Sequence, residues 1–242
     1  MKNILLTCIG LACGLSAALG EVKSQTTIRI TERGPHHRVW ERVTTVTDAD
    51  GKAVSQTNSY TELETGMHFL EKGEWREAKA EIEILADQAL ARNGAHQVIF
   101  APNLASAGVV DLKTPDDKRL LSHIVGLSYF DGATGQAVLI AEPKDCIGGV
   151  LPPNQVYYQD AFDNVKADVR YTYTKAGLEQ DIILRAQPPA PEQFGFNPKT
   201  TRLQVLTEFL EAPTPTKQTV TEIKWLADEQ LDFGAMQIGQ GR

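Results

Sequence analysis

The stretch Val165–Arg185, VKADVRYTYTKAGLEQDIILR, decides the fold of this chain. Apolar and polar side chains alternate in two runs on either side of the tripeptide Lys175-Ala176-Gly177. Alternation with a period of two, in residues that are mostly β-branched or aromatic, is typical of a strand with one buried face. A glycine at the reversal suits a turn that needs a positive φ angle, so we predict a β-hairpin with Gly177 in that conformation.

Alternation also assigns the two faces of this hairpin. Tyr171 and Tyr173 fall on the face that carries the apolar residues of the first strand, and Thr172 falls on the opposite face. In the second strand, Leu178 and Ile182 return to the apolar face. We therefore expect Tyr171 and Ile182 to face one core from adjacent strands.

The rest of the chain repeats this pattern of short runs separated by turn residues, at the spacing typical of sandwiches and barrels. We predict an all-β fold for residues 38–242, a large antiparallel β-sandwich of about a dozen short strands with little helix. Residues 74–92 are good helix formers, yet residues 76–85 alternate strictly, which favours a strand there and leaves a helix as the alternative. The final ten residues have the pattern of a new strand, so we expect further sequence beyond them.

The first twenty residues form a separate segment. A basic Lys2 precedes the apolar run 4–15, and small residues stand at Ala18 and Gly20. This arrangement is typical of a secretory signal peptide, here cleaved before Glu21. We therefore expect the mature chain to be secreted or held at the cell surface.

Two further expectations follow for the N-terminal region. A lipoprotein signal that uses Cys13 is the less favoured alternative, because the apolar run continues past this cysteine. Residues 21–37 are expected to form a lead-in to the sandwich. No later apolar run reaches the length that a membrane-spanning helix needs.

Composition limits the partners and the chemistry. The 242 residues carry a formal net charge of −7 without a cluster of basic residues, which disfavours a nucleic-acid partner. Cleavage of the signal peptide removes two of the three cysteines and leaves Cys146, which has no partner for an internal disulfide. Because no histidine lies near it in sequence, we expect Cys146 to be a packed thiol rather than a nucleophile.

The sequence lacks the common catalytic and metal-binding motifs. It has no phosphate-binding glycine loop, no paired-cysteine zinc site and no serine-hydrolase elbow, so we predict no catalytic residue, cofactor or metal. The tetrapeptide that begins at Asp48 resembles the start of a calcium loop, but Ser59 stands where that loop needs a glutamate. The histidines are expected to be packed or solvated: His36, His37, His68, His96 and His123.

Carboxylates and aromatic residues provide the candidate binding groups. Two converging carboxylates could act on a sugar, although alternation favours the wet faces of strands for most of the candidates. The candidate carboxylates are Glu142, Asp145, Asp160, Asp168, Glu179, Asp181 and Glu208. An exposed aromatic platform is the second option, and its candidates are Tyr157, Tyr158, Phe194 and Phe196. The alternative for the two phenylalanines is that they anchor their proline-rich loop to the sheet.

The hairpin sequence VRYTYTKAGLEQDIIL, with VIFAPN before it and TTRLQVLTEF after it, resembles the N-terminal part of large exported bacterial proteins of unassigned function. Some of these proteins carry tyrosine-aspartate (RHS-type) repeats downstream. The resemblance spans residues 65–240 and implies export, an all-β fold and a longer protein, without any catalytic motif. Together these features favour a structural or adhesion module of a cell-surface protein. The alternative is a carbohydrate-binding or carbohydrate-active domain.

Overall fold

The computed structural model describes residues 23–48, 50–223 and 226–239, and in this part of the chain nearly all regular structure is antiparallel β. The all-β prediction is confirmed. The one helical segment of the described residues is a short 3-10 turn, Pro191–Phe194, in the proline-rich loop. The described residues contain no helix of a length and hydropathy that could cross a membrane. The predicted signal peptide lies outside the described residues.

The chain divides into two compact units. The described part of the first unit comprises residues 23–32, 38–48 and 50–62, and the second comprises residues 33–37 together with the described chain from Leu63 onward. Residues 38–62 therefore lie outside the sandwich unit that the sequence predicted to begin at residue 38. The expected lead-in is a strand from Lys23, because its Thr- and Ile-rich residues pair with the strand that follows.

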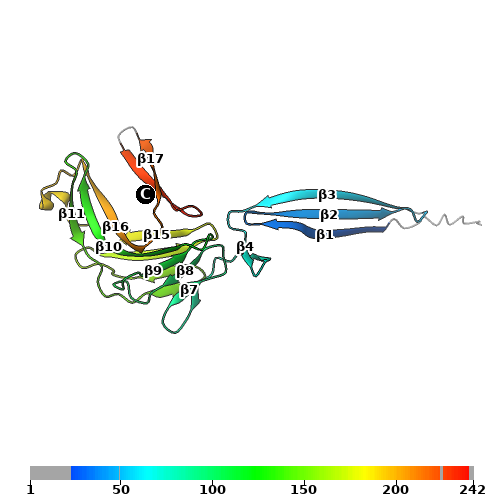
Figure 1. The fold of residues 1–242 in the computed structure, drawn as a ribbon, viewed down its shortest axis with the longest axis horizontal. Helices are drawn as coiled ribbons and strands as arrows, with labels where there is room; N and C mark the ends of the chain where they lie inside the picture. The colour runs from blue at the N-terminus through cyan, green and yellow to red at the C-terminus, as the bar shows by residue number, and fades with distance from the viewer. Residues whose placement is uncertain (1–22, 49, 224–225, 240–242) are drawn as a thin grey trace, which may run out of the picture. The chain divides into compact units, whose positions relative to one another are not determined.

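The first unit is a single antiparallel sheet of three long strands, drawn side by side in blue and cyan in Figure 1. The strand order is β1-β2-β3, so β2 lies in the centre. The strands are β1 (Lys23–Gly34), β2 (His37–Thr47) and β3 (Ala53–Leu63). Most side chains of this three-stranded sheet are exposed, and the sheet has no buried layer of its own.

The second unit is built on two larger sheets and two small ones. In the seven-stranded sheet, the long strand β10 pairs with β9 and β11 along one edge and with β16 along the other. Its strands are β6 (Glu83–Ile84), β7 (Ala89–Ala91), β8 (Gln97–Phe100), β9 (Val110–Lys113), β10 (Arg119–Asp131), β11 (Gln136–Ala141) and β16 (Thr201–Glu211). The four-stranded sheet, in the order β12-β13-β14-β15, contains β12 (Gly149–Leu151), β13 (Gln155–Tyr158), β14 (Ala167–Tyr173) and β15 (Leu178–Leu184).

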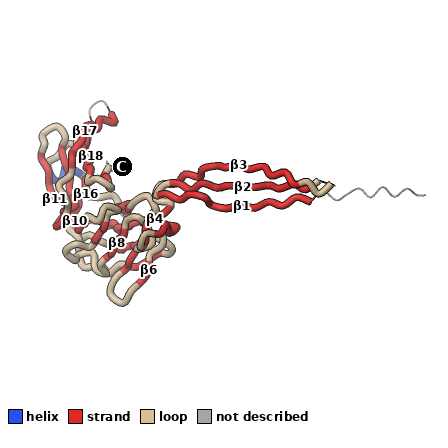
Figure 2. Tube along the Cα trace, turned by 45° about the vertical axis from the view of Figure 1, so that its right-hand side comes forward, coloured by secondary structure: helices blue, strands red, loops and turns tan. Residues whose placement is uncertain are grey.

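The two small sheets flank this pair. One is the hairpin of β4 (His68–Glu71) and β5 (Glu74–Glu77). The other has the order β17-β18-β19, with β17 (Thr216–Ile223), β18 (Leu226–Asp232) and β19 (Gln237–Ile238). It joins the core through Phe233, whose ring lies 6.0 Å from that of Phe209 on β16. Figure 2 shows that strands and loops make up nearly all of the described chain.

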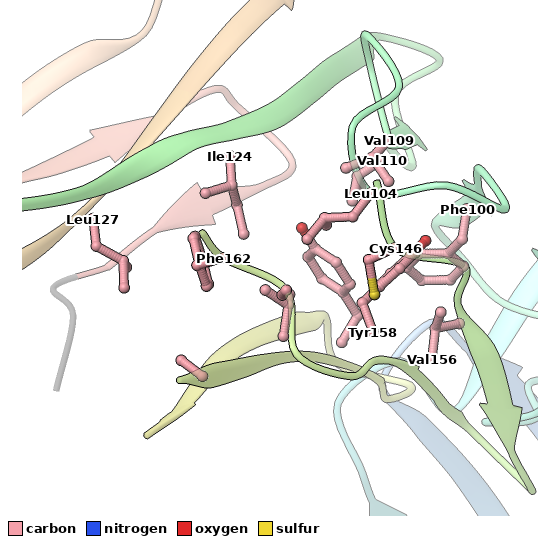
Figure 3. Close-up of a cluster of buried hydrophobic side chains, with 14 of the residues drawn as sticks. Phe100, Leu104, Val109, Val110, Ile124, Leu127, Cys146, Val156, Tyr158 and Phe162 are labelled. Carbon is pink, nitrogen blue, oxygen red and sulfur yellow. The ribbon is translucent and has the colours of Figure 1, made fainter. Parts of the chain in front are cut away.

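The core of the second unit lies between its two larger sheets. Phe100 of β8 contacts Tyr171 of β14, with ring centroids 5.7 Å apart. The Tyr158 hydroxyl donates a hydrogen bond to the Ala101 carbonyl, and the Tyr173 hydroxyl donates to the His96 carbonyl. Each of these contacts joins the four-stranded sheet to β8 or to a residue that flanks it, so the packing is sandwich-like. Figure 3 shows Phe100 and Tyr158 within this core.

The predicted hairpin is present with the predicted faces. Tyr171 lies opposite Gln180 and Val169 lies opposite Ile182, so Tyr171 and Ile182 share a face. The prediction of a positive φ at Gly177 is wrong, because this glycine is not among those in the left-handed region. A longer reversal replaces the tight turn: the Thr174 amide donates to the Gly177 carbonyl, and the Gly177 amide donates to the Thr174 hydroxyl. A four-residue loop closed in this way needs no left-handed residue.

Residues 74–92 are not helical. The strand predicted for residues 76–85 is present only at its ends, in β5 and β6, and residues 78–82 lie between strands. Their backbone bonds to distant segments instead: the Ala78 amide donates to Met67, and the Lys79 amide donates to Asn93. These partners override the helix propensity of the segment, because a helix would bond each amide to its own preceding turn.

Candidate functional site

The most elaborate polar cluster of the second unit surrounds Asp168. Alternation assigns Asp168 to the face of β14 opposite Tyr171, yet the residue is only 2% exposed. Its carboxylate accepts hydrogen bonds from the Tyr157 hydroxyl, from the Arg185 guanidinium and from the Asp160 amide. The Arg185 guanidinium also lies over the Tyr157 ring, 6.0 Å from its centroid. The cluster thereby joins β13, β14 and Arg185, the residue that follows β15, on the outer face of the four-stranded sheet.

Hydrogen bonding determines the charge state of this cluster. Burial raises the pKa of Asp168, but the bonds from Tyr157, Asp160 and Arg185 outweigh burial and hold the pKa of this carboxyl below its ordinary value. Burial and the bond to Asp168 raise the pKa of Tyr157. The cluster therefore holds an ionised Asp168, a neutral Tyr157 and a charged Arg185 at neutral pH. Its donors and acceptors satisfy one another, which suits a clamp between strands rather than a group that exchanges protons with a substrate.

Cys146 is packed, as the sequence predicted. It is buried beside Tyr158, as Figure 3 shows, and its thiol donates to the Gln159 carbonyl at 2.9 Å. Burial raises the pKa of the Cys146 thiol. A protonated, buried thiol is a poor nucleophile, so this residue contributes packing.

The four predicted aromatic residues do not form one platform. Tyr158 lies in the core with no exposed surface. Tyr157 is partly buried in the Asp168 cluster, with Arg185 over its ring. Phe194 packs edge-on against Tyr129 of β10, with ring centroids 5.9 Å apart, and Phe196 also packs against the core. The two phenylalanines thus anchor the proline-rich loop to the sheet, while each keeps part of its surface exposed.

The candidate carboxylates are mostly paired with separate basic partners. Asp160 pairs with Lys144 at 2.6 Å, Asp181 with Arg170 at 3.0 Å, and Glu208 lies 3.4 Å from His123. The remaining candidates lie apart from this set: Asp145 accepts from Asn103, the Glu142 amide donates to Asp163, and Glu179 lies opposite Thr172. Only Asp160 and Asp168 are joined directly, and that bond uses the Asp160 amide rather than its carboxylate.

The histidines have structural surroundings. The His36 ring accepts from the Gly66 amide, and the His68 ring bonds to the Gly34 carbonyl at 2.9 Å. His96 is 2% exposed, and burial lowers its pKa, so the ring is neutral at physiological pH. Within the described part of the chain, no group of three or more His, Cys, Asp or Glu side chains has the arrangement of a metal site.

One open groove of about 370 Å³ lies on the seven-stranded sheet. Its charged residues bind one another: Arg119 holds Asp111 through two bonds of 2.8 Å, and Lys113 lies 2.6 Å from Asp117. Leu90 also lines the groove. The described lining residues include no aromatic ring on which a sugar could stack.

The first unit presents a different kind of surface. Trp40 of β2 stacks on Tyr60 of β3, with ring centroids 6.3 Å apart, so these residues share a face. Alternation places Val54 on the same face. Because Arg29 pairs with Glu41 on the opposite face, its neighbour Ile28 also lies on the Trp40 face.

This surface, which we call the Trp40 face, is open to solvent. Ile28, Val54 and Tyr60 are 56%, 61% and 58% exposed. The opposite face carries hydroxyl groups, such as the Thr45–Ser55 pair at 2.8 Å, beside the Arg29–Glu41 pair. Sequence reasoning assigned no role to Trp40 or Tyr60.

Comparison with protein-family models, with curated proteins and with solved structures finds no match for this chain. A proposal about function therefore depends on the chain's own surfaces.

Proposed function

We propose that the chain is an exported surface module with a structural or adhesive role, and that the Trp40 face makes the contact. The observation that carries this proposal is the exposure of Ile28, Val54 and Tyr60 on one face of a sheet that has no buried layer. Small β-sheets in water are stable when a hydrophobic face is covered by another layer. Large apolar side chains that stay exposed on one face of a sheet suit a surface that meets a partner.

Arg38 gives this face a specific architecture. Its guanidinium lies 5.1 Å above the Trp40 ring centroid and donates two hydrogen bonds to Glu62, and the Trp40 indole nitrogen donates to the same carboxylate at 2.8 Å. These contacts hold Trp40 and Tyr60 in fixed orientations. Fixed aromatic side chains lose little conformational entropy on binding, which suits a contact surface.

Cell fractionation tests the adhesive role. In a bacterial host that produces the chain with residues 1–20, we expect the exported wild type to remain on washed cells. A variant with Ile28→Thr, Val54→Thr and Tyr60→Thr should pass into the medium. A matched control with Thr27→Ser, Ser55→Thr and Ser59→Thr alters the hydroxyl-bearing face and should stay on the cells. Release of wild type and control into the medium, equal to that of the first variant, would contradict the proposal.

Intact mass of the same exported material tests the export step. We expect Glu21 as the first residue, as the signal-peptide pattern predicts. A mature chain that retains residues 1–20, or that carries a lipid on Cys13, would contradict cleavage before Glu21.

The partial exposure of Phe194 and Phe196 favours a second candidate function, carbohydrate binding. A glycan array with the mature chain distinguishes the two candidates. Binding of a glycan that is lost in Phe194→Ala and Phe196→Ala, and kept in the Trp40-face variant, would support this second candidate.

A further inference from the structure

Strand β3 is an edge strand with an unusual composition. It stands last in the order β1-β2-β3, and in the described part of the chain no strand lies on its outer side. Ten of its eleven side chains are exposed. From Ala53 to Thr61 the sequence AVSQTNSYT contains neither a charge nor a proline. Natural edge strands usually carry charges or prolines, because an unprotected edge is a template for pairing with another chain.

The other edge of the same sheet is protected in the usual way. Strand β1 carries Lys23, Arg29, Glu32 and Arg33 along its twelve residues. Arg29 lies near its middle, so antiparallel pairing of β1 with a second β1 would bring two like charges close together, which is unfavourable. The two edges of one sheet thus differ: β1 resists pairing with a copy of itself, and β3 does not.

We propose that β3 pairs antiparallel with β3 of a second copy of this chain, about a two-fold axis, and forms a continuous six-stranded sheet. The partner is a second copy because the strand complements itself. With Thr57 opposite Thr57 of the second copy, Val54 lies opposite Tyr60 and Ser55 lies opposite Ser59. Aromatic residues opposite β-branched ones, and hydroxyl groups opposite hydroxyl groups, are favourable cross-strand pairs.

The ends of the strand fit the same register. Lys52, just before β3, falls opposite Glu62 of the second copy, so opposite charges meet at both ends of the junction. A two-fold axis makes each of these contacts twice and closes the assembly at two copies. The Trp40 face continues across the junction, because Val54 and Tyr60 lie on it. This inference names a partner for the surface module and so rests on the proposed function.

The mass of the mature chain in solution, measured by light scattering and by sedimentation over a range of concentrations, tests the pairing. We expect a dimer. Thr57→Lys places two ammonium groups opposite each other on the axis and should weaken dimerisation at least about tenfold. Thr27→Lys, the same change at an exposed position of β1, should leave the dimer intact.

A cysteine variant gives a second measurement that does not depend on destabilising the sheet. Under mild oxidation Thr57→Cys should form a disulfide-linked dimer, because the two residues lie opposite each other, whereas Thr27→Cys should remain unlinked. A monomer at all concentrations would overturn the pairing, as would an oligomer that Thr57→Lys leaves unchanged. Pairing of β3 with a different protein in place of a second copy would also overturn it. A monomeric chain that still stays on washed cells would overturn the pairing alone and leave the adhesive role standing.

Discussion

The three-stranded sheet β1–β3 and the four-stranded sheet β12–β15 are both antiparallel, and side chains alternate between the two faces of each. The two sheets differ in how far these side chains are buried. In β14 the alternating residues Val169, Tyr171 and Tyr173 are at most 1% exposed, because the seven-stranded sheet covers them. In β3 the residues at comparable positions, Val54 and Tyr60, are 61% and 58% exposed. Alternation therefore specifies which side chains share a face, and a second layer determines whether that face becomes a core.

This difference has an energetic consequence. Burying a large apolar side chain stabilises a fold by about 1.5–3 kcal/mol relative to leaving it exposed. The β12–β15 sheet gains this stabilisation within one chain, whereas the exposed side chains of the first sheet gain it only on contact with a partner. We therefore expect substitutions in the first sheet to affect association and those in the second to affect folding.

The largest effect is expected at Tyr171. Because its ring is buried against Phe100 and Tyr158, Tyr171→Ala should lower the free energy of unfolding by about 3–5 kcal/mol through the cavity that it leaves. Thr172→Ala, one residue along on the opposite face, should cost less than about 1 kcal/mol. Urea unfolding of both variants measures the contrast. Equal losses would show that both faces of β14 are packed, and a greater loss at Thr172 would show that the faces are reversed.

A smaller effect is expected at Asp168. Asp168→Asn leaves Arg185 without its carboxylate partner and should cost about 1–3 kcal/mol at neutral pH. The pKa of Asp168 in the folded chain lies below its ordinary value of 3.8, so the ionised carboxylate stabilises the fold above that pH. This stabilisation is lost as the pH falls through the lowered pKa.

The wild type should therefore lose its advantage over Asp168→Asn as the pH falls below about 4. Unfolding free energies of the two proteins at a series of pH values provide the test. A difference that stays constant through this range would contradict the charged state assigned to Asp168.

Cys146→Ser is expected to have a modest effect, on the order of 1 kcal/mol. The serine hydroxyl can donate to the Gln159 carbonyl as the thiol does, and no disulfide is broken. The melting temperature measures this change. A collapse of folding would mean that the thiol has a role that its packing does not explain.

The smallest effect on folding is expected at Tyr60. Because the side chain is 58% exposed, Tyr60→Ala should change the free energy of unfolding of the isolated chain by less than about 0.5 kcal/mol at low protein concentration. Circular dichroism during urea unfolding measures this. A loss as large as that of Tyr171→Ala would show that the first sheet is as tightly packed as the second.

The fold class and the faces of the hairpin Val165–Arg185 could be predicted because alternation is a local signal. The turn at Gly177 was mispredicted, since the choice between a tight and a four-residue loop depends on where the Thr174 hydroxyl bonds. The helix-forming residues 74–92 show the limit of propensity, because backbone partners at Met67 and Asn93 are distant in the sequence.

The polar cluster was harder to predict than the fold. Asp168 was visible as a candidate, but its partners Tyr157 and Arg185 come from two other strands, and only the register brings them together. Tyr158 was proposed for a platform beside Tyr157, yet adjacent residues of a strand point to opposite sides, and Tyr158 points into the core. The sequence alone shows that residues 53–61 of β3 carry no charge, but it does not show that this strand lies at the edge of its sheet.

Hydrogen exchange of the mature chain at several protein concentrations tests most directly whether one sheet is stabilised by its own core and the other by a partner. We expect the amides of β14 to be strongly protected at every concentration, since their strand lies in the core. Protection of the amides of β3 should be weak in dilute solution and should rise with concentration. Strong protection of β3 in dilute solution, equal to that of β14, would contradict this account.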